Sequence, residues 1–209
     1  MDDFCIEDGI LVRYYGEGGN VKIPDGITSI YKNAFRSCSK ITDISIPESV
    51  TSIGQLAFVG CKGLTDIKFP DRLKVIGEAA FYCCGNLKTV SIPCGAVSIE
   101  THAFSRCSAL TSLIFFSVNT TSNNRNTESV ENGLKCGNSV SSGCAPMISI
   151  GTGAFAGCNA LTEITIPDCV TSIDGQFSYC GNFTVKCTKN SYAYDYCLNN
   201  GYRIEEITV

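Results

Sequence analysis

The stretch Ala57-Phe58-Val59-Gly60-Cys61 decides the fold, because its Ala-Phe-x-x-Cys motif returns along the whole chain. Copies of the motif stand at residues 34–38, 80–84, 103–107 and 154–158, and a looser copy stands at 176–180. The phenylalanines of the first four copies recur at one constant interval: Phe35, Phe58, Phe81 and Phe104. A fixed period of about 20 to 30 residues is typical of solenoids, in which each coil stacks on its neighbours. The sequence therefore predicts a repeat protein that forms a single domain over residues 1–209.

Each repeat also contains two extended segments. The run Ile41–Pro47 alternates apolar and polar residues and ends at a proline, which cannot donate to a β-ladder, so it predicts a short strand. Residues 50–54 form a second extended piece, and the Ala-Phe-x-x-Cys motif then makes a tight helical or 3₁₀ turn. The prolines keep the interval of the phenylalanines: Pro24, Pro47, Pro70 and Pro93. Two independent markers thus agree on a coil of about 23 residues.

The first segment, residues 1–20, departs from the repeat. It holds two short apolar runs, Phe4–Ile6 and Ile10–Val12, with glycines that follow the pattern of hairpin turns. This pattern predicts an N-terminal hairpin that covers the open apolar end of the first coil.

Repeats are predicted over 21–116 and 147–187, with an insert between them. The interval from Phe104 to Phe155 is 51 residues, which is more than twice the period. The insert, 117–146, is rich in Ser, Asn, Thr and Gly, and this composition indicates a long solvated loop.

The last segment, residues 188–209, is predicted to close the array with a short helix and a strand. Ser191 or Asn190 can cap the start of the helix, and Gly201 can cap its end. The strand is expected to run from Arg203 to Ile207.

Charge and hydropathy exclude several classes of partner. The net charge is -4, and no cluster of Lys and Arg stands in the sequence, so nucleic acid and anionic membranes are not expected as partners. No stretch approaches the roughly 18 apolar residues of a spanning helix, so no membrane insertion is expected. The start, Met1-Asp2-Asp3-Phe4, lacks the basic and apolar regions of a signal peptide.

Fourteen cysteines would be typical of a disulfide scaffold, but their positions favour another interpretation. Six of them stand three residues after the repeat phenylalanine, at the same place in successive coils: Cys38, Cys61, Cys84, Cys107, Cys158 and Cys180. Free cysteine behaves as a small buried hydrophobe, so this cysteine column predicts reduced core packing, with disulfides or metal as the alternatives. Cys136 and Cys144 in the insert are candidates for a disulfide. No pair has the spacing of a structural zinc site, and neither a metal nor another cofactor is expected.

Catalytic devices are poorly supported. The single histidine, His102, precedes the motif at 103–107, and its cysteine neighbour Cys107 belongs to the predicted core. Nucleophilic catalysis needs a base, a nucleophile and an orienting group brought together, and the sequence shows no such set. We therefore expect no enzymatic activity.

With this template, the chain resembles the BspA-like leucine-rich repeat proteins. The residues that carry the resemblance are Leu64-x-x-Ile67-x-Phe69-Pro70, Val75-Ile76-Gly77 and Ala80-Phe81-x-x-Cys84, with their copies over 21–186. The resemblance implies an α/β repeat: a right-handed leucine-rich repeat solenoid with a parallel concave β-sheet. It also implies adhesion or protein recognition at a microbial cell surface or after secretion.

In a leucine-rich repeat, alternate residues of the concave strands point outward, and these positions are the candidate binding residues. Most are polar, and toward the insert, at Ile114 and Phe116, the strip becomes apolar while Phe115 belongs to the core. The candidates are Lys22, Asp43, Ser45, Asp66, Lys68, Thr89, Ser91, Ser112, Ile114, Phe116, Glu163 and Thr165.

The sequence supports two hypotheses on function. The first is a non-enzymatic module that binds a protein or glycan partner through the concave sheet. The second is a structural or self-associating solenoid without a specific ligand, in which coil ends or the Phe116 region make the contact. The oligomeric state is left open by the sequence.

Overall fold

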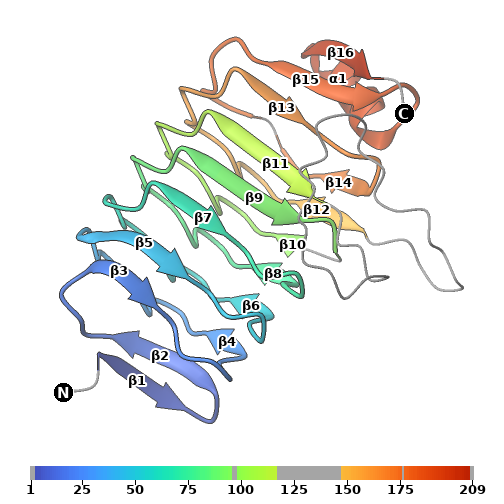
Figure 1. Cartoon of the computed structure of the whole chain (residues 1–209). Coiled ribbons are helices and arrows are strands. Elements are labelled where there is room, and N and C mark those ends of the chain that lie inside the picture. Colours follow the sequence, from blue (N-terminus) through green and yellow to red (C-terminus); the bar gives the residue numbers. More distant parts are fainter. Residues whose placement is uncertain (1–2, 96–97, 117–146, 176, 208–209) are drawn as a thin grey trace, which may run out of the picture.

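The structure is a computed structural model that describes residues 3–95, 98–116, 147–175 and 177–207. The chain winds into a β-solenoid of about seven turns with about 23 residues per turn (Figure 1). The predicted solenoid and its period are confirmed. The fold differs from the expected α/β repeat, since helix in the described part is limited to one element, α1. The predicted insert, 117–146, with Cys136 and Cys144, lies outside the described residues.

One side of the solenoid is an eight-stranded sheet, which we call the short-strand sheet. Its neighbouring strands are parallel, apart from the antiparallel hairpin of the first two. In order along the sheet, the strands are β1 (Phe4–Glu7), β2 (Ile10–Tyr14), β4 (Ser29–Ile30), β6 (Ser52–Ile53), β8 (Val75–Ile76), β10 (Ser98–Ile99), β12 (Ile148–Ile150) and β14 (Val170–Ile173).

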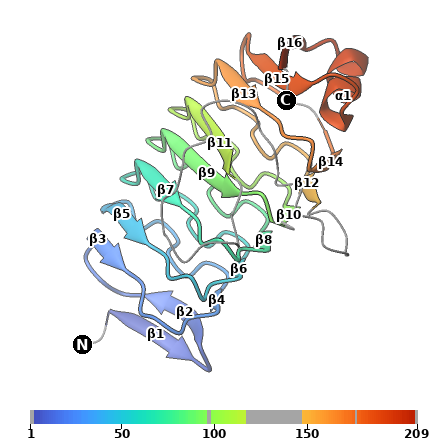
Figure 2. The ribbon, with the colours of Figure 1, turned by 45° about the vertical axis from the view of Figure 1, so that its right-hand side comes forward.

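The other side carries the strand that the alternating run predicts, and we call it the long-strand face. Its strands pair in parallel in three groups that follow one another along the solenoid (Figure 2). The groups are β3 (Gly19–Lys22) with β5 (Ile41–Ser45); β7 (Asp66–Lys68), β9 (Thr89–Pro93) and β11 (Ser112–Phe116); and β13 (Glu163–Thr165), β15 (Thr184–Thr188) and β16 (Arg203–Ile207).

The Ala-Phe-x-x-Cys motifs form a third side, made of hydrogen-bonded turns. Within a coil, Cys61 N donates to Phe58 O at 3.1 Å, the i to i+3 bond of a tight turn. Between coils, Phe58 N donates to Ala80 O and Phe81 N to Ala103 O, both at 2.7 Å. Backbone groups of the turns are thus satisfied alternately within a coil and by the next coil, so each turn fixes the position of its neighbour.

Close approach of the coils explains a recurrent glycine after the short strands. A Cβ added to Gly77 would lie 2.8 Å from Gln55 N and from Ile53 O of the preceding coil. Gly54 and Gly151 stand in the same tight position. Glycine is used here because the backbones pack too closely for a side chain.

The core is a column of parallel phenylalanine rings, all at most 1% exposed from Phe35 to Phe155. Successive ring centroids lie 4.7, 4.9, 5.1 and 5.5 Å apart, with interplanar angles of 8° or less. The last of these steps joins Phe104 to Phe155, so the stack continues across the insert. Both ends are closed by other aromatic residues, since Tyr14 packs on Phe35 and Tyr202 packs on Phe177.

The cysteine column lies beside this stack and packs in the core, apart from the half-buried Cys38. Each buried thiol faces the carbonyl of the phenylalanine 25, 26 or 54 residues earlier. Cys84 Sγ, for example, donates to Phe58 O at 3.1 Å, and Cys180 Sγ to Phe155 O at 3.0 Å. Burial raises the pKa of Cys84 and of Cys158 to about 12, so these thiols are protonated at neutral pH and are poor nucleophiles.

The C-terminal end is closed by α1 (Tyr192–Asn200), in the position that the sequence predicts. Ser191 Oγ accepts from Tyr194 N, and Gly201 ends the helix at φ 71°. Tyrosine hydroxyls cover the last coil: Tyr202 OH accepts from Phe177 N at 3.0 Å, and Tyr196 OH donates to Gly175 O. No described helix has the length and apolar character needed to cross a bilayer.

The phenylalanine stack gives a direct test of which side of each coil is inside. Phe81→Ala removes a fully buried ring and should lower the free energy of unfolding by about 3 to 5 kcal/mol. Ser91→Ala, on the long-strand face, should change it by about 0.5 kcal/mol or less. Urea unfolding followed by circular dichroism measures both. Equal effects of the two substitutions would contradict the assignment of inside and outside.

The buried thiols predict an alkaline loss of stability. In the folded chain the pKa of Cys84 is about 12, against an ordinary value of 9.0, so its contribution is complete below pH 9.0 and is lost as the pH rises toward 12. Each such thiol should lower the free energy of unfolding by about 1.4 kcal/mol per pH unit in that window. Urea unfolding at several pH values should therefore give a shallower decline for Cys84→Ala than for the unsubstituted chain. Identical slopes would show that Cys84 does not carry this effect.

Candidate functional site

The long-strand face brings the predicted binding residues together in two rows. The register pairs Asp66 with Thr89 and Lys68 with Ser91, and the next strand adds Ser112 and Ile114 opposite these. At the N-terminal end, Lys22 pairs with Ser45, and Asp43 lies in the row of Asp66 one period earlier. The longer interval across the insert places Glu163 and Thr165 in the same two rows beyond it. The repeat spacing thus identifies which side chains share a face.

Burial alternates along these strands as a half-buried sheet requires. In β9, Val90 and Ile92 are buried, whereas Thr89 and Ser91 between them are partly exposed. The exposed residues among the candidates are Lys22, Asp43, Ser45, Asp66, Lys68, Ile114 and Glu163, and the partly exposed ones are Thr89, Ser91, Ser112 and Thr165. All of these side chains lie outside the core.

The charges on the first long strands, β3 to β7, are available to a ligand. Neither Lys22, Asp43, Asp66 nor Lys68 takes part in an ion pair between described residues. Nor do these four side chains donate or accept a described hydrogen bond. Positive and negative groups alternate over a surface that otherwise carries hydroxyls.

The C-terminal end of the same face is different, and sequence reasoning missed part of it. Lys186 of β15 lies 2.9 Å from Glu163 and 3.9 Å from Glu205, and the hydrogen bond to Glu163 raises the pKa of the Lys186 ammonium. The alternation Thr184-Val185-Lys186 could have identified β15 as a further strand of this face, with Thr184 and Lys186 pointing outward. Because these charges are paired, they are less available than those of β3 to β7.

One apolar position interrupts the polar rows. Ile114 is 47% exposed, while Phe115 is buried, as the sequence predicts. Phe116 ends β11, but its side chain lies outside what the structure describes. Met147, which follows the insert, is 56% exposed.

In the part of the chain that it describes, the structure does not bring the residues considered for catalysis and metal binding together into a site. His102 is exposed and adopts φ 57°, and its ring lies against Gly153. Cys107 is fully buried and donates to Phe81 O at 3.3 Å. Among the described residues, no group of three His, Cys, Asp or Glu side chains is placed to hold a metal ion.

A shallow hollow of 260 Å³ on the short-strand sheet was not expected from the sequence. It lies at the ends of β10 and β12, between Glu78, Glu100 and Asp174, with Ser98 and Ser149 on its floor. Its carboxylates serve neighbouring groups: Glu100 Oε2 accepts from Glu78 N at 2.9 Å, and Asp174 accepts from Ser172. These contacts explain the hollow as part of the coil packing.

Comparisons with known proteins match this geometry. The crystal structure of a leucine-rich repeat protein from T. pallidum superposes with a TM-score of 0.50 at 25% identity, over 85% of this chain and 62% of that one. A leucine-rich cell surface protein from Faecalibacterium prausnitzii gives 0.52 at 27% identity, over 90% and 37%. The pneumococcal vaccine antigen PcpA gives 0.61 at 17% identity, over 99% and 46%, and supports the fold alone.

This chain therefore spans between about a third and two thirds of the length of these structures. Comparison with curated proteins gave no significant match. The profile of the BspA-type leucine-rich repeat region, in six copies, matches residues 14–130 and 139–209. Because that match covers most of the chain and follows the coils described above, the chain belongs to the BspA-type leucine-rich repeat family.

Proposed function

We propose that this chain is a non-enzymatic recognition or adhesion module that binds a protein or glycan partner through the long-strand face. The observation that carries the proposal is the row structure of that face. Over β3 to β9, exposed Lys and Asp side chains outside any described ion pair alternate with hydroxyls in fixed register. The backbone register already fixes where these side chains start, so the ordering cost of binding is limited to their own rotamers.

The direction of curvature belongs to the same proposal. We take the long-strand face to be the concave side of a right-handed solenoid, as in leucine-rich repeats generally. A concave side surrounds a partner on several coils at once, which multiplies weak polar contacts. The lack of aromatic anchors among the described positions of this face favours many modest contacts over a few dominant ones.

We propose a surface or secreted location for this chain, in keeping with its family. One of the similar structures is described as a cell surface protein, and recognition of an external partner requires such a location. We propose that the chain acts there as a single domain.

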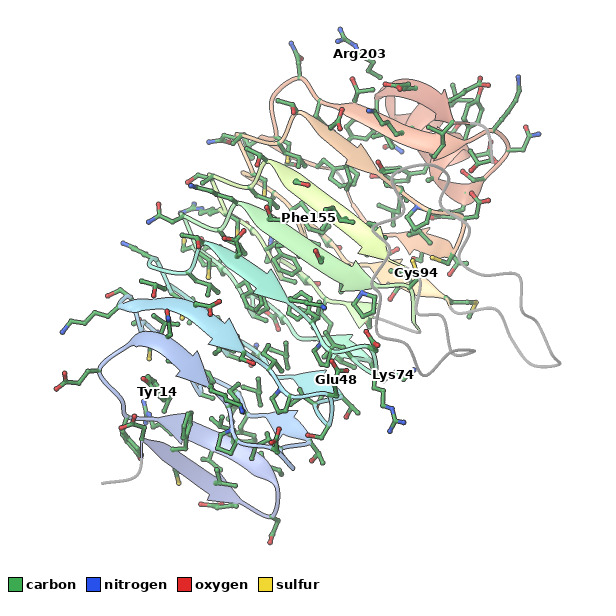
Figure 3. All side chains as sticks on the ribbon, in the orientation of Figure 1. Tyr14, Glu48, Lys74, Cys94, Phe155 and Arg203 are labelled. Carbon is green, nitrogen blue, oxygen red and sulfur yellow. The ribbon has the colours of Figure 1, made fainter. Side chains whose placement is uncertain are left out.

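The proposal can be tested with a panel of purified extracellular-matrix glycoproteins and mucins in biolayer interferometry. The variant Asp66→Arg/Ser91→Arg reverses a charge and adds bulk at the centre of the face. Glu48→Arg/Thr51→Arg makes the same change in net charge on the turn beyond the long strands, where Figure 3 places Glu48. We expect the face variant to weaken binding at least tenfold, and the control variant to change it less than twofold. Two results would assign binding to another surface: equal weakening by both variants, or weakening by the control variant alone.

A self-associating solenoid is the second candidate, favoured by Ile114, an apolar side chain that is 47% exposed on the long-strand face. Sedimentation velocity over a range of concentrations tests it. A recognition module with a free face should remain monomeric, and Ile114→Ser should leave its sedimentation coefficient unchanged. A dimer that dissociates on Ile114→Ser would support self-association instead.

A further inference from the structure

Coil stacking creates a second surface that the sequence does not reveal. Each coil has an edge between its repeat phenylalanine and its next long strand. Hydrogen bonds join these edges directly: Gly60 N donates to Tyr82 O at 2.8 Å, and Cys83 N to Ser105 O at 3.0 Å. Asn86 Nδ2 also donates to Lys62 O at 2.7 Å. Residues far apart in the sequence therefore follow one another along a continuous edge.

This edge is basic over four successive coils. The segments 36–40, 59–65, 82–88 and 105–111 contain no Asp or Glu, and all five of their cations are exposed. We call these cations the basic edge: Arg36, Lys40, Lys62, Lys88 and Arg106. Figure 3 shows nitrogen-tipped side chains along the side of the solenoid where the long strands begin.

The cations of the basic edge are not neutralised within the described part of the chain. None of them takes part in an ion pair between described residues. Arg36 donates to the neutral Asn33 side chain at 3.2 Å, and the Arg106 guanidinium lies 5.6 Å from the centre of the Tyr82 ring. Their charge is therefore available to an external anion.

The spacing of the coils makes these charges act together. The phenylalanine rings that mark the four coils lie 4.7, 4.9 and 5.1 Å apart. This step is shorter than the Debye length of about 8 Å at physiological ionic strength, so the potentials of neighbouring coils add. The opposite turns are of mixed charge, since they carry Asp25, Glu48, Asp71 and Asp168 together with Arg72 and Lys74.

The neighbours of the cations indicate the chemistry of the partner. The edge also exposes Ser37, Ser39, Asn86 and Ser108, which can hydrogen-bond to hydroxyl groups. Its one aromatic residue in these coils, Tyr82, is partly buried and faces Arg106. Binding of single-stranded nucleic acid relies on exposed aromatic stacking platforms, and hot spots of protein interfaces cluster in well-packed patches that exclude water. With one partly buried ring among exposed cations and hydroxyls, the basic edge offers neither a row of stacking platforms nor an apolar cluster.

We propose that the basic edge binds an extended anionic polysaccharide, with the five cations contacting its sulfate or carboxylate groups and the edge hydroxyls and amides contacting its sugar hydroxyls. The five cations are distinct from the candidate residues of the long-strand face, and the edge adjoins the start of the long strands. Rigid spacing of one or two cations per coil suits a linear polymer that carries charges at regular intervals.

The test uses a heparin oligosaccharide as the probe, titrated calorimetrically into the full chain at about 0.1 M NaCl, where the Debye length is about 10 Å. Lys62→Glu/Lys88→Glu reverses the charge of the two cations at the centre of the basic edge. The matched control, Arg72→Glu/Lys74→Glu, makes the same change in net charge on the opposite turn, where Figure 3 places Lys74. We expect at least tenfold weaker binding for the edge variant and less than threefold for the control. The affinity of the unsubstituted chain should fall with salt at a log-log slope of about -3.5, which is about 0.7 for each of the five contacted charges, as for a single-stranded polyanion.

Three results would overturn the proposal. Equal weakening by both variants would show that only net charge matters. Undetectable binding of heparin by the unsubstituted chain would show that the edge does not hold a polyanion. Tighter binding of an oligothymidylate of equal charge, lost in the edge variant, would assign the edge to nucleic acid. Thermal unfolding of each variant, followed by circular dichroism, confirms that any loss arises in a folded protein.

Discussion

The fold depends on the stacking of one phenylalanine per coil, together with the backbone hydrogen bonds that join each coil to the next. The ring of Phe58 can lie parallel to that of Phe81 only if the two coils are in register, and the bond from Phe58 N to Ala80 O enforces that register. The cysteine thiols strengthen the same junction, because each donates to a carbonyl that belongs to a stacked phenylalanine. Packing, backbone and thiol thus impose one geometry on these junctions, and the short-strand sheet, the long-strand face and the edges follow from it.

The sequence predicts much of this arrangement because the repeat is an unusually strong signal. The constant repeat interval identifies equivalent positions, so the buried side of Val90 and the exposed side of Ser91 could be assigned without coordinates. The caps of α1 were also predictable, since Ser191 and Gly201 act through local backbone geometry. Short helical turns were expected where the structure has hydrogen-bonded turns. The difference arises because residues such as Leu56 and Ala79 adopt positive φ, which interrupts a helix and is not visible in their side chains.

The sequence was less informative about surfaces that span coils. Lys62 and Lys88 are separated by more than one full repeat and do not form a cluster by any local count of charge. They share an edge only because the backbone returns to the same side once per coil. The ion pair between Lys186 and Glu163 was missed for the same reason, since it depends on the pairing of β13 with β15. In a solenoid, the local sequence identifies the buried residues. The pattern of exposed charges appears only when residues about one repeat apart are compared.

The phenylalanine stack continues although the sequence between two of its rings is much longer than one repeat, and this bears on how such chains can evolve. Phe104 and Phe155 are 51 residues apart in the sequence, yet their rings lie 5.5 Å apart with an interplanar angle of 1°. A coil junction therefore accepts added chain at this point of the sequence without losing alignment, because closing a longer connection increases the entropic cost only slowly. The same position offers protein engineers a place to display a foreign peptide. During evolution, it lets a lineage acquire new sequence while the scaffold keeps its shape.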